Sequence, residues 1–281
     1  MNNKLTLHPF TRGLLYILIG LVLVITIYPF FWALMASFKS VEDSMNHPPY
    51  MLPTALYLGN YENVFMRSNI PRYFINSVFI TVTTLTLSIL FSAPAAYSLT
   101  KIKFPGAHQI VTFLLMGMMI PVFVCLIPMF RIYNTIGLRN SYWAVILPQL
   151  GFGLPSAIFL YQGFMRYIPD SLCEAAMIDG ANSMQIFTRV VFPMSKNTTC
   201  TILTTKFVTV WNEFTYANTF LTGSSKKTLP IGLNDFVEFT GYRDWGSTFA
   251  GIVVSITPTL IIYYILNKHV IQGVSDGALK T

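Results

Sequence analysis

The chain has 281 residues, of which 53% are hydrophobic and only 10% are charged. Soluble domains have about 25% charged residues, so this composition excludes an ordinary soluble globule and favours a membrane protein. The net charge of +7 fits basic residues in the loops beside membrane spans better than a nucleic-acid-binding surface.

Six apolar runs follow one another along the chain, each near the length of about 20 residues that a helix needs to cross the hydrocarbon layer. They are residues 14–36, 74–99, 110–130, 142–165, 198–221 and 249–267. The fifth run is the weakest, because Lys206 and Glu213 interrupt it. We therefore expect an all-α membrane protein with six transmembrane helices. We read the first run as a retained span rather than a cleaved signal peptide, because it is too long and lacks a clear A-x-A site.

The orientation of the spans follows only weakly from charge. An even number of spans places both termini on one side of the membrane, and basic residues are almost equally frequent on the two sides. Lys101 and Lys103 in the tight turn between the second and third runs favour cytoplasmic termini, whereas Arg131 and Arg139 oppose this orientation.

The polar segment 171–193 predicts two short helices joined by a sharp turn. Ser171 and Glu174 have capping-box spacing at the start of the first helix. Gly180 follows that helix at the position where glycine adopts the left-handed conformation. Ser183 is expected to cap the second helix, whose apolar stripe would be Ile186, Phe187 and Val190. Such a hairpin either rests on the membrane surface or docks with a soluble partner.

The sequence of this segment resembles a motif of a known family. "EAAMIDG", nine residues and "VVFP" are similar to the EAA loop of ATP-binding-cassette (ABC) importer permeases, whose pattern is E-A-A, three residues, G, nine residues and I-x-L-P. The matching residues are Glu174, Ala175, Ala176, Gly180, Val190, Phe192 and Pro193. Valine and phenylalanine replace the usual isoleucine and leucine. The stretches "PMFRIYNTIGLRNSYWAVILPQ", "WNEFTYANTFL" and "GVSDGALK" are similar to the sugar-importing branch of the family, and in particular to the smaller permease of maltose importers.

The resemblance implies a type I ABC importer permease fold with a cytoplasmic coupling-helix hairpin. Residues 1–71 would form an N-terminal span with an outer cap segment, 72–267 the permease core, and 268–281 a cytoplasmic tail. The implied partners are a second related permease, two ATPase subunits and an extracytoplasmic solute-binding protein. The hairpin would sit in a cleft of an ATPase subunit, with Glu174 and Asp179 facing basic groups and Gly180 setting its angle. The implied location is the cytoplasmic membrane of a bacterium or archaeon, with both termini in the cytoplasm.

Polar residues in the fifth run are candidates for the transport path. Lys206 and Glu213 are seven residues apart, which is two turns of one helix face, and Trp211 and Asn212 adjoin Glu213. A charge at the centre of a bilayer costs at least about 2.5 to 3.5 kcal/mol, so these side chains should face the interior of the bundle. They would line a sugar path, form a structural salt bridge or, for Lys206, extend to the cytoplasmic surface.

The outer loop before the sixth run corresponds, by the resemblance, to the segment with which such a permease reaches its binding protein. The implied contact residues are Asn234, Asp235 and Trp245. No phosphate-binding G-x-x-x-x-G-K-[ST] motif or other catalytic motif occurs, so we expect no enzyme activity and no cofactor, with ATP and magnesium bound by partner subunits. The three cysteines form neither a disulfide scaffold nor a metal-binding pattern.

Two other classes of protein remain as alternatives. A secondary transporter or channel would suit broken spans and buried charges, but it would leave the EAA-like loop unexplained. A membrane scaffold without a transport role would have no water-accessible path at Glu213. The sequence does not identify the sugar, because the binding protein largely determines specificity in this family.

Overall fold

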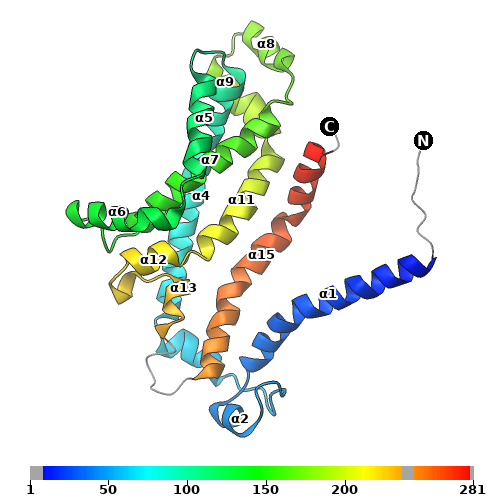
Figure 1. The fold of residues 1–281 in the computed structure, drawn as a ribbon, viewed down its shortest axis with the longest axis vertical. Helices are drawn as coiled ribbons and strands as arrows, with labels where there is room; N and C mark the ends of the chain where they lie inside the picture. The colour runs from blue at the N-terminus through cyan, green and yellow to red at the C-terminus, as the bar shows by residue number, and fades with distance from the viewer. Residues whose placement is uncertain (1–8, 236–243, 279–281) are drawn as a thin grey trace. The chain divides into compact units, whose positions relative to one another are not determined.

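The computed structural model describes residues 9–235 and 244–278, with side chains as far as residue 266. The predicted all-α class is confirmed, since the described residues contain helices and turns but no strand. Backbone contacts divide the chain into two units, one of residues 1–70 and 233–254 and one of residues 71–232 and 255–281. Figure 1 shows the helices of both units, coloured along the chain.

The first unit contains the N-terminal helix and the predicted cap segment. Its elements are α1 (Pro9–Ala36), α2 (Val41–Asn46), α3 (Gly59–Glu62), the π-helical turn η1 (Asn63–Arg67) and the beginning of α15 (Trp245–Ala278). Hydrogen bonds hold the cap together, because Asn60 donates to the carbonyls of Ser37 and Lys39 at 2.8 and 2.7 Å. Asp43 is buried and accepts from the backbone and hydroxyl of Thr54. The cap is therefore an ordered structure of its own.

The second unit holds the helices of the predicted core. They are α4 (Ile70–Lys101), α5 (Ala107–Met118), α6 (Val122–Thr135), α7 (Trp143–Met165), α8 (Asp170–Ile178), α9 (Ser183–Ile186), the turn η2 (Phe187–Val191), α10 (Phe192–Met194), α11 (Lys196–Trp211), α12 (Thr215–Phe220), the 3₁₀ turn η3 (Ser224–Lys226), α13 (Leu229–Gly232) and the part of α15 from Ser255 onward. In Figure 1, α8 and α9 lie at one end of this unit, and α12 and α13 lie at the other.

Four described helices are long and apolar enough to cross a membrane: α1, α4, α7 and the Trp245–Leu266 part of α15. The third predicted run is instead divided into α5 and α6, which bend by 93°. Pro121 explains the break, because it has no N–H to donate and disfavours helical geometry in the residue before it. If this bent pair is one span, the described helices provide five spans by length and composition.

The fifth predicted run does not form one continuous helix. Helix α11 has 16 residues and ends at Trp211, and α12 begins at Thr215. The run is rich in threonine, whose hydroxyl groups lower its mean hydropathy below that of the other spans. The count of six spans therefore stays a prediction. The expected tail, 268–281, lies partly in α15, which continues to Ala278, and its last three residues lie outside the described part.

Candidate functional site

The hairpin at residues 170–191 forms as a helix, a sharp turn and a second helix. Gly180 has φ of +83°, so it occupies the left-handed conformation expected of it. The Gly180 and Ala181 N–H groups donate to the Met177 and Ala176 carbonyls, at 3.0 and 2.9 Å, and thereby close the end of α8. The turn thus connects the two helices with four residues, 179–182, and α9 begins at Ser183.

The predicted caps of both hairpin helices are wrong in detail. Helix α8 begins at Asp170, directly after Pro169, and no side chain caps it, so Ser171 is not the cap. Pro169 is the N-cap residue, with an extended ψ of 133°, so the helix starts two residues earlier than predicted. Asn182, rather than Ser183, caps α9 through a capping box with Gln185, with both hydrogen bonds at 2.9 Å.

One face of the hairpin is anchored to the long helices. Cys173, Ile186 and Val191 are buried in a cluster with Tyr97 of α4 and Tyr161 of α7. Val191 replaces the predicted Val190 in the apolar stripe, because the π-helical turn η2 shifts the buried face by one residue. Burial raises the pKa of the Cys173 thiol. These buried contacts would transmit a displacement of the hairpin to α4 and α7.

The exposed part of the hairpin mixes acidic with apolar groups. Glu174, Ala175 and Asp179 are exposed, and Ala176 packs inward against the buried cluster. Large apolar side chains are exposed beside them: Leu172, Met177, Ile178 and Met184. Pro193 is exposed within the short helix α10, which leads the chain into α11. Exposed apolar groups together with carboxylates are typical of a surface that a protein partner covers.

An ion pair links this hairpin to the end of α4, and no local sequence pattern indicates it. The Lys101 ammonium donates to a carboxylate oxygen of Asp170 at 2.6 Å and to the Ile168 carbonyl. The Lys101 side chain is only 6% exposed. The hydrogen bond from Lys101, and next its charge, lower the pKa of Asp170. The partners are 69 residues apart, so only the fold brings them together.

The predicted path residues lie in different surroundings from those expected. Because α11 ends at Trp211, Lys206 and Glu213 do not share a face of one helix, and the ion pairs among the described residues do not include this pair. The Lys206 ammonium donates to the Gly153 carbonyl of α7 at 2.5 Å. The Glu213 carboxylate accepts from the N–H groups of Tyr216 and Ala217, at 2.6 and 3.0 Å. Glu213 therefore caps the start of α12.

Trp211 and Asn212 also have structural partners. Trp211 is buried, its indole N–H donates to the Ser255 carbonyl of α15 at 2.9 Å, and its ring contacts Phe74 of α4 edge-on. Asn212 is exposed, and its amide donates to the Val208 carbonyl of its own helix. The assignment of these four residues to a transport path stays a prediction, and the contacts show how each is held.

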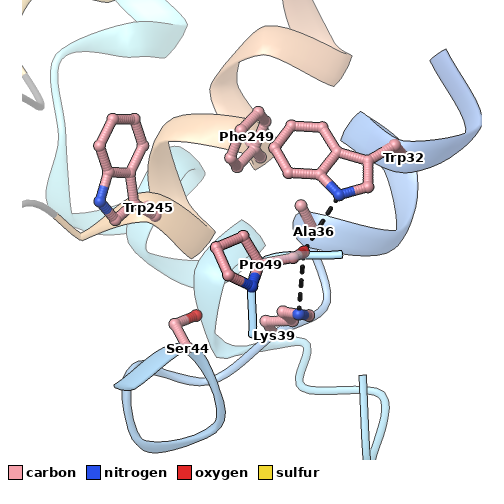
Figure 2. A pocket seen from close by; sticks show the side chains of 7 residues that line it. All are labelled: Trp32, Ala36, Lys39, Ser44, Pro49, Trp245 and Phe249. Carbon is pink, nitrogen blue, oxygen red and sulfur yellow. Dashed lines mark hydrogen bonds between the residues drawn. The ribbon is translucent and has the colours of Figure 1, made fainter. Parts of the chain in front are cut away.

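The predicted binding-protein contacts lie in the first unit. Trp245 begins α15 and lines a pocket of about 340 Å³ together with Trp32, Ala36, Lys39, Ser44, Pro49 and Phe249. Figure 2 shows the indole of Trp32 and the ammonium of Lys39 both directed at the Pro49 carbonyl, at 3.1 and 3.3 Å. Asn234 is exposed and Asp235 is half-buried. The loop between Asp235 and Asp244 lies outside the described residues.

Comparisons with known proteins agree with this architecture. The family model of the binding-protein-dependent transport system inner membrane component matches residues 88–276. The diacetylchitobiose uptake system permease protein NgcG of Streptomyces coelicolor is 34% identical over 92% of this chain and 85% of its own length. The multiple sugar-binding transport system permease protein MsmG of Streptococcus mutans is 32% identical over 94% of this chain and 96% of its own.

A solved structure shares the fold of nearly the whole chain. The chain of a bacterial ABC transporter involved in the import of the acidic polysaccharide alginate superposes with a TM-score of 0.84. It is 25% identical, and the match covers 93% of this chain and 96% of that one. The chain therefore belongs to the family of binding-protein-dependent transport system inner membrane components, and it is a membrane permease subunit of an ABC importer.

Proposed function

We propose that this permease translocates a carbohydrate, and that separate ATPase subunits drive it through the exposed hairpin. The observation that carries the proposal is the shape and chemistry of that hairpin. It exposes Glu174, Asp179 and large apolar side chains, while its buried residues are packed against α4 and α7. A surface of this kind fits a cleft in a soluble partner, and the buried contacts would carry the partner's movement into the long helices.

Carbohydrate is the substrate class that the relatives favour. The names of NgcG and MsmG refer to diacetylchitobiose and to multiple sugars, and the superposed transporter imports a polysaccharide. The family name itself implies a solute-binding protein that delivers the substrate. Asn234, Asp235 and Trp245 are proposed to meet that protein outside the cytoplasm. The hairpin would meet a cytoplasmic ATPase, so with six spans both termini would be cytoplasmic as well.

A second permease subunit is part of the proposal. Helix α1 is apolar along its length, and none of its most apolar 18-residue window is buried within this chain. Its surface is therefore covered by lipid or by another subunit, and the second permease subunit would cover part of it. The ATPase subunits would bind ATP and magnesium, since this chain carries no phosphate-binding loop motif.

A co-purification experiment tests the assignment of the hairpin. The tagged chain is expressed in membranes with the products of its neighbouring genes, once with the native hairpin and once with Glu174→Ala and Gly180→Val together. We expect an ATPase subunit to co-purify with the native chain and to be lost with the altered one, while the membrane level of the chain is unchanged. Absence of an ATPase in both preparations would contradict the proposal and favour a secondary transporter or channel.

A further inference from the structure

A row of buried hydroxyl groups lies on one face of α4. Its members are Thr81, Thr84, Ser88 and Ser92, which are 2%, 2%, 3% and 0% exposed. With about 100° between successive residues of a helix, the four fall within an arc of roughly 80°. They span about 16 Å along the axis at 1.5 Å per residue, which is about half the hydrocarbon thickness. We call them the α4 hydroxyl face.

The hydroxyl oxygens of all four residues are buried and have no hydrogen-bond partner among the described residues. Thr100, Thr228 and Thr259 also have a buried hydroxyl without a partner in the described part of the chain, but they occur singly and not as a row. On α11, five threonines donate to the carbonyl four residues earlier in their own helix: Thr199, Thr201, Thr204, Thr205 and Thr209. The side chains of the α4 hydroxyl face do not form this hydrogen bond to their own helix, although they too lie on a long helix.

Polar groups on the neighbouring turn of α4 do have hydrogen-bond partners. Asn76 donates to the carbonyls of Ser225 and Lys227 and accepts from the Tyr142 hydroxyl, at 3.1, 2.8 and 2.8 Å. Ser77 accepts from the Leu229 N–H at 2.8 Å. These groups hold the loop around η3 against α4. The α4 hydroxyl face begins where this network ends, so it is a separate feature.

Apolar clusters lie on α4 directly before and directly after the α4 hydroxyl face. Ile80 belongs to a buried cluster with residues of α6, α7 and α12, and Ala93, Ala96 and Tyr97 belong to the other, with residues of α7, α8 and η2. An apolar surrounding makes an unpartnered hydroxyl costly. A sequence that needed only close packing here would be served better by alanine. The hydroxyl groups therefore indicate a ligand that hydrogen-bonds to them in another state of the transport cycle.

We propose that the α4 hydroxyl face is a wall of the translocation path, wetted when the path opens and able to bind a neutral polyhydroxylated solute. This inference rests on the proposed function and names a part of the chain that would meet the sugar. A hydroxyl group both donates and accepts, as do the hydroxyl groups of a sugar, and none of the four carries charge. The face therefore supplies matching hydrogen bonds without the desolvation cost of an ionised group.

Threonines on opposite faces of the same helix provide a matched test. Thr84 is buried, whereas Thr86, two residues on, is exposed on the opposite side of α4. The complex of this chain with its partner subunits is prepared with Cys125, Cys173 and Cys200 replaced by alanine. Thr84→Cys, Ser88→Cys and Thr86→Cys are then introduced singly. Labelling by a membrane-impermeant cationic methanethiosulfonate is followed without nucleotide and with ATP plus vanadate, and the exposed loop variant Ser224→Cys is the positive control.

We expect Thr84→Cys and Ser88→Cys to react in at least one nucleotide state, several-fold faster than Thr86→Cys. Lack of labelling at both positions in both states, in a complex that still takes up sugar with ATP and labels at Ser224→Cys, would overturn the inference. If the parent complex shows no ATP-dependent uptake of any of a panel of labelled oligosaccharides, the proposed function fails instead. The two failures are therefore distinguishable.

An isosteric pair separates a transport role from a packing role. Thr84→Val removes one hydroxyl and keeps the shape of the side chain, so a purely structural face would leave uptake unchanged and the melting temperature equal or higher. We expect a several-fold loss of uptake rate with no fall in melting temperature, and no loss in Thr86→Val. Unchanged uptake in Thr84→Val and in Ser88→Ala would overturn the inference.

Discussion

At the scale of single residues, Gly180 is the position where backbone conformation decides the shape of the hairpin. Its φ is +83°, and a side chain built there would meet no atom within 4 Å, so the effect of a substitution is confined to the backbone. We expect Gly180→Val to cost about 1 kcal/mol or more in local strain and to lower sugar uptake per ATP hydrolysed. Gly163→Val is the control, because it lies in open space without a positive φ. Normal uptake per ATP in Gly180→Val would show that the turn tolerates another geometry.

Asn182 and Ser183 offer a second comparison of adjacent residues. Asn182 makes the capping box of α9, and no cap hydrogen bond involves the Ser183 side chain. Asn182→Ala should therefore destabilise the start of α9 by about 1 kcal/mol, with little change in Ser183→Ala. The measurement is hydrogen exchange at the Gln185 amide, which should become faster only in the first variant. Equal exchange in both variants would contradict the assigned cap.

Glu213 illustrates how a charge in an apolar run can serve the backbone. Its carboxylate accepts from two N–H groups at the start of α12. Removing the acceptor leaves these groups unpaired, so Glu213→Ala should destabilise the complex by about 1 to 3 kcal/mol. Thermal unfolding in detergent measures the loss. Asn212→Ala is the control, because Asn212 is exposed and donates only to its own helix. A melting temperature equal to that of the parent in Glu213→Ala would contradict this role.

At the scale of elements, the ion pair between Lys101 and Asp170 links the hairpin directly to the long helix α4. Lys101→Met should lower uptake per ATP hydrolysed, because the ammonium bonds both Asp170 and the Ile168 carbonyl. Lys101→Arg should retain most of the coupling, and the exchange Lys101→Asp with Asp170→Lys should recover part of it. Lys103→Met is the control, since this exposed neighbour affects Asp170 only through its charge.

The same contact predicts a flat dependence on pH. The lowered pKa of Asp170 keeps its carboxylate ionised below the ordinary value of about 3.9. Its contribution is therefore complete at neutral pH and is lost only as the pH falls through the lowered pKa. Between about pH 6 and 8, uptake per ATP should not change with pH in the parent, and it should be equally independent of pH in Asp170→Asn. A fall in uptake per ATP across that pH range in the parent, but not in Asp170→Asn, would contradict the ion pair as described.

Local signals account for the elements that the sequence predicted correctly. The hairpin depends on short-range features such as Gly180 and Pro169, and its turn forms where the sequence indicates. Contacts between distant residues were not predictable, among them Lys101 with Asp170 and the Trp211 indole with the Ser255 carbonyl. The shared helix face of Lys206 and Glu213 was wrong, because the prediction assumed one continuous helix and α11 ends before Glu213.

At the scale of the whole molecule, the chain is one subunit of an ABC importer. The family match covers residues 88–276, and the long helices carry the exposed hairpin and the α4 hydroxyl face within one unit. Helix α1 lies in the other unit and has almost no buried residue of its own. Exposed apolar surface of this extent is typical of a membrane or protein interaction site. The source of energy for transport is therefore the question that separates an importer subunit from a self-sufficient transporter.

Uptake into proteoliposomes tests this central claim most directly. The chain is reconstituted with the permease and ATPase that co-purify with it, and labelled oligosaccharides are supplied with the solute-binding protein. Uptake is then compared under ATP on the ATPase side and under an imposed proton or sodium gradient without ATP. The account predicts uptake with ATP alone, lost when Glu174 and Gly180 are both replaced. Uptake driven by an ion gradient in the absence of the ATPase would contradict it.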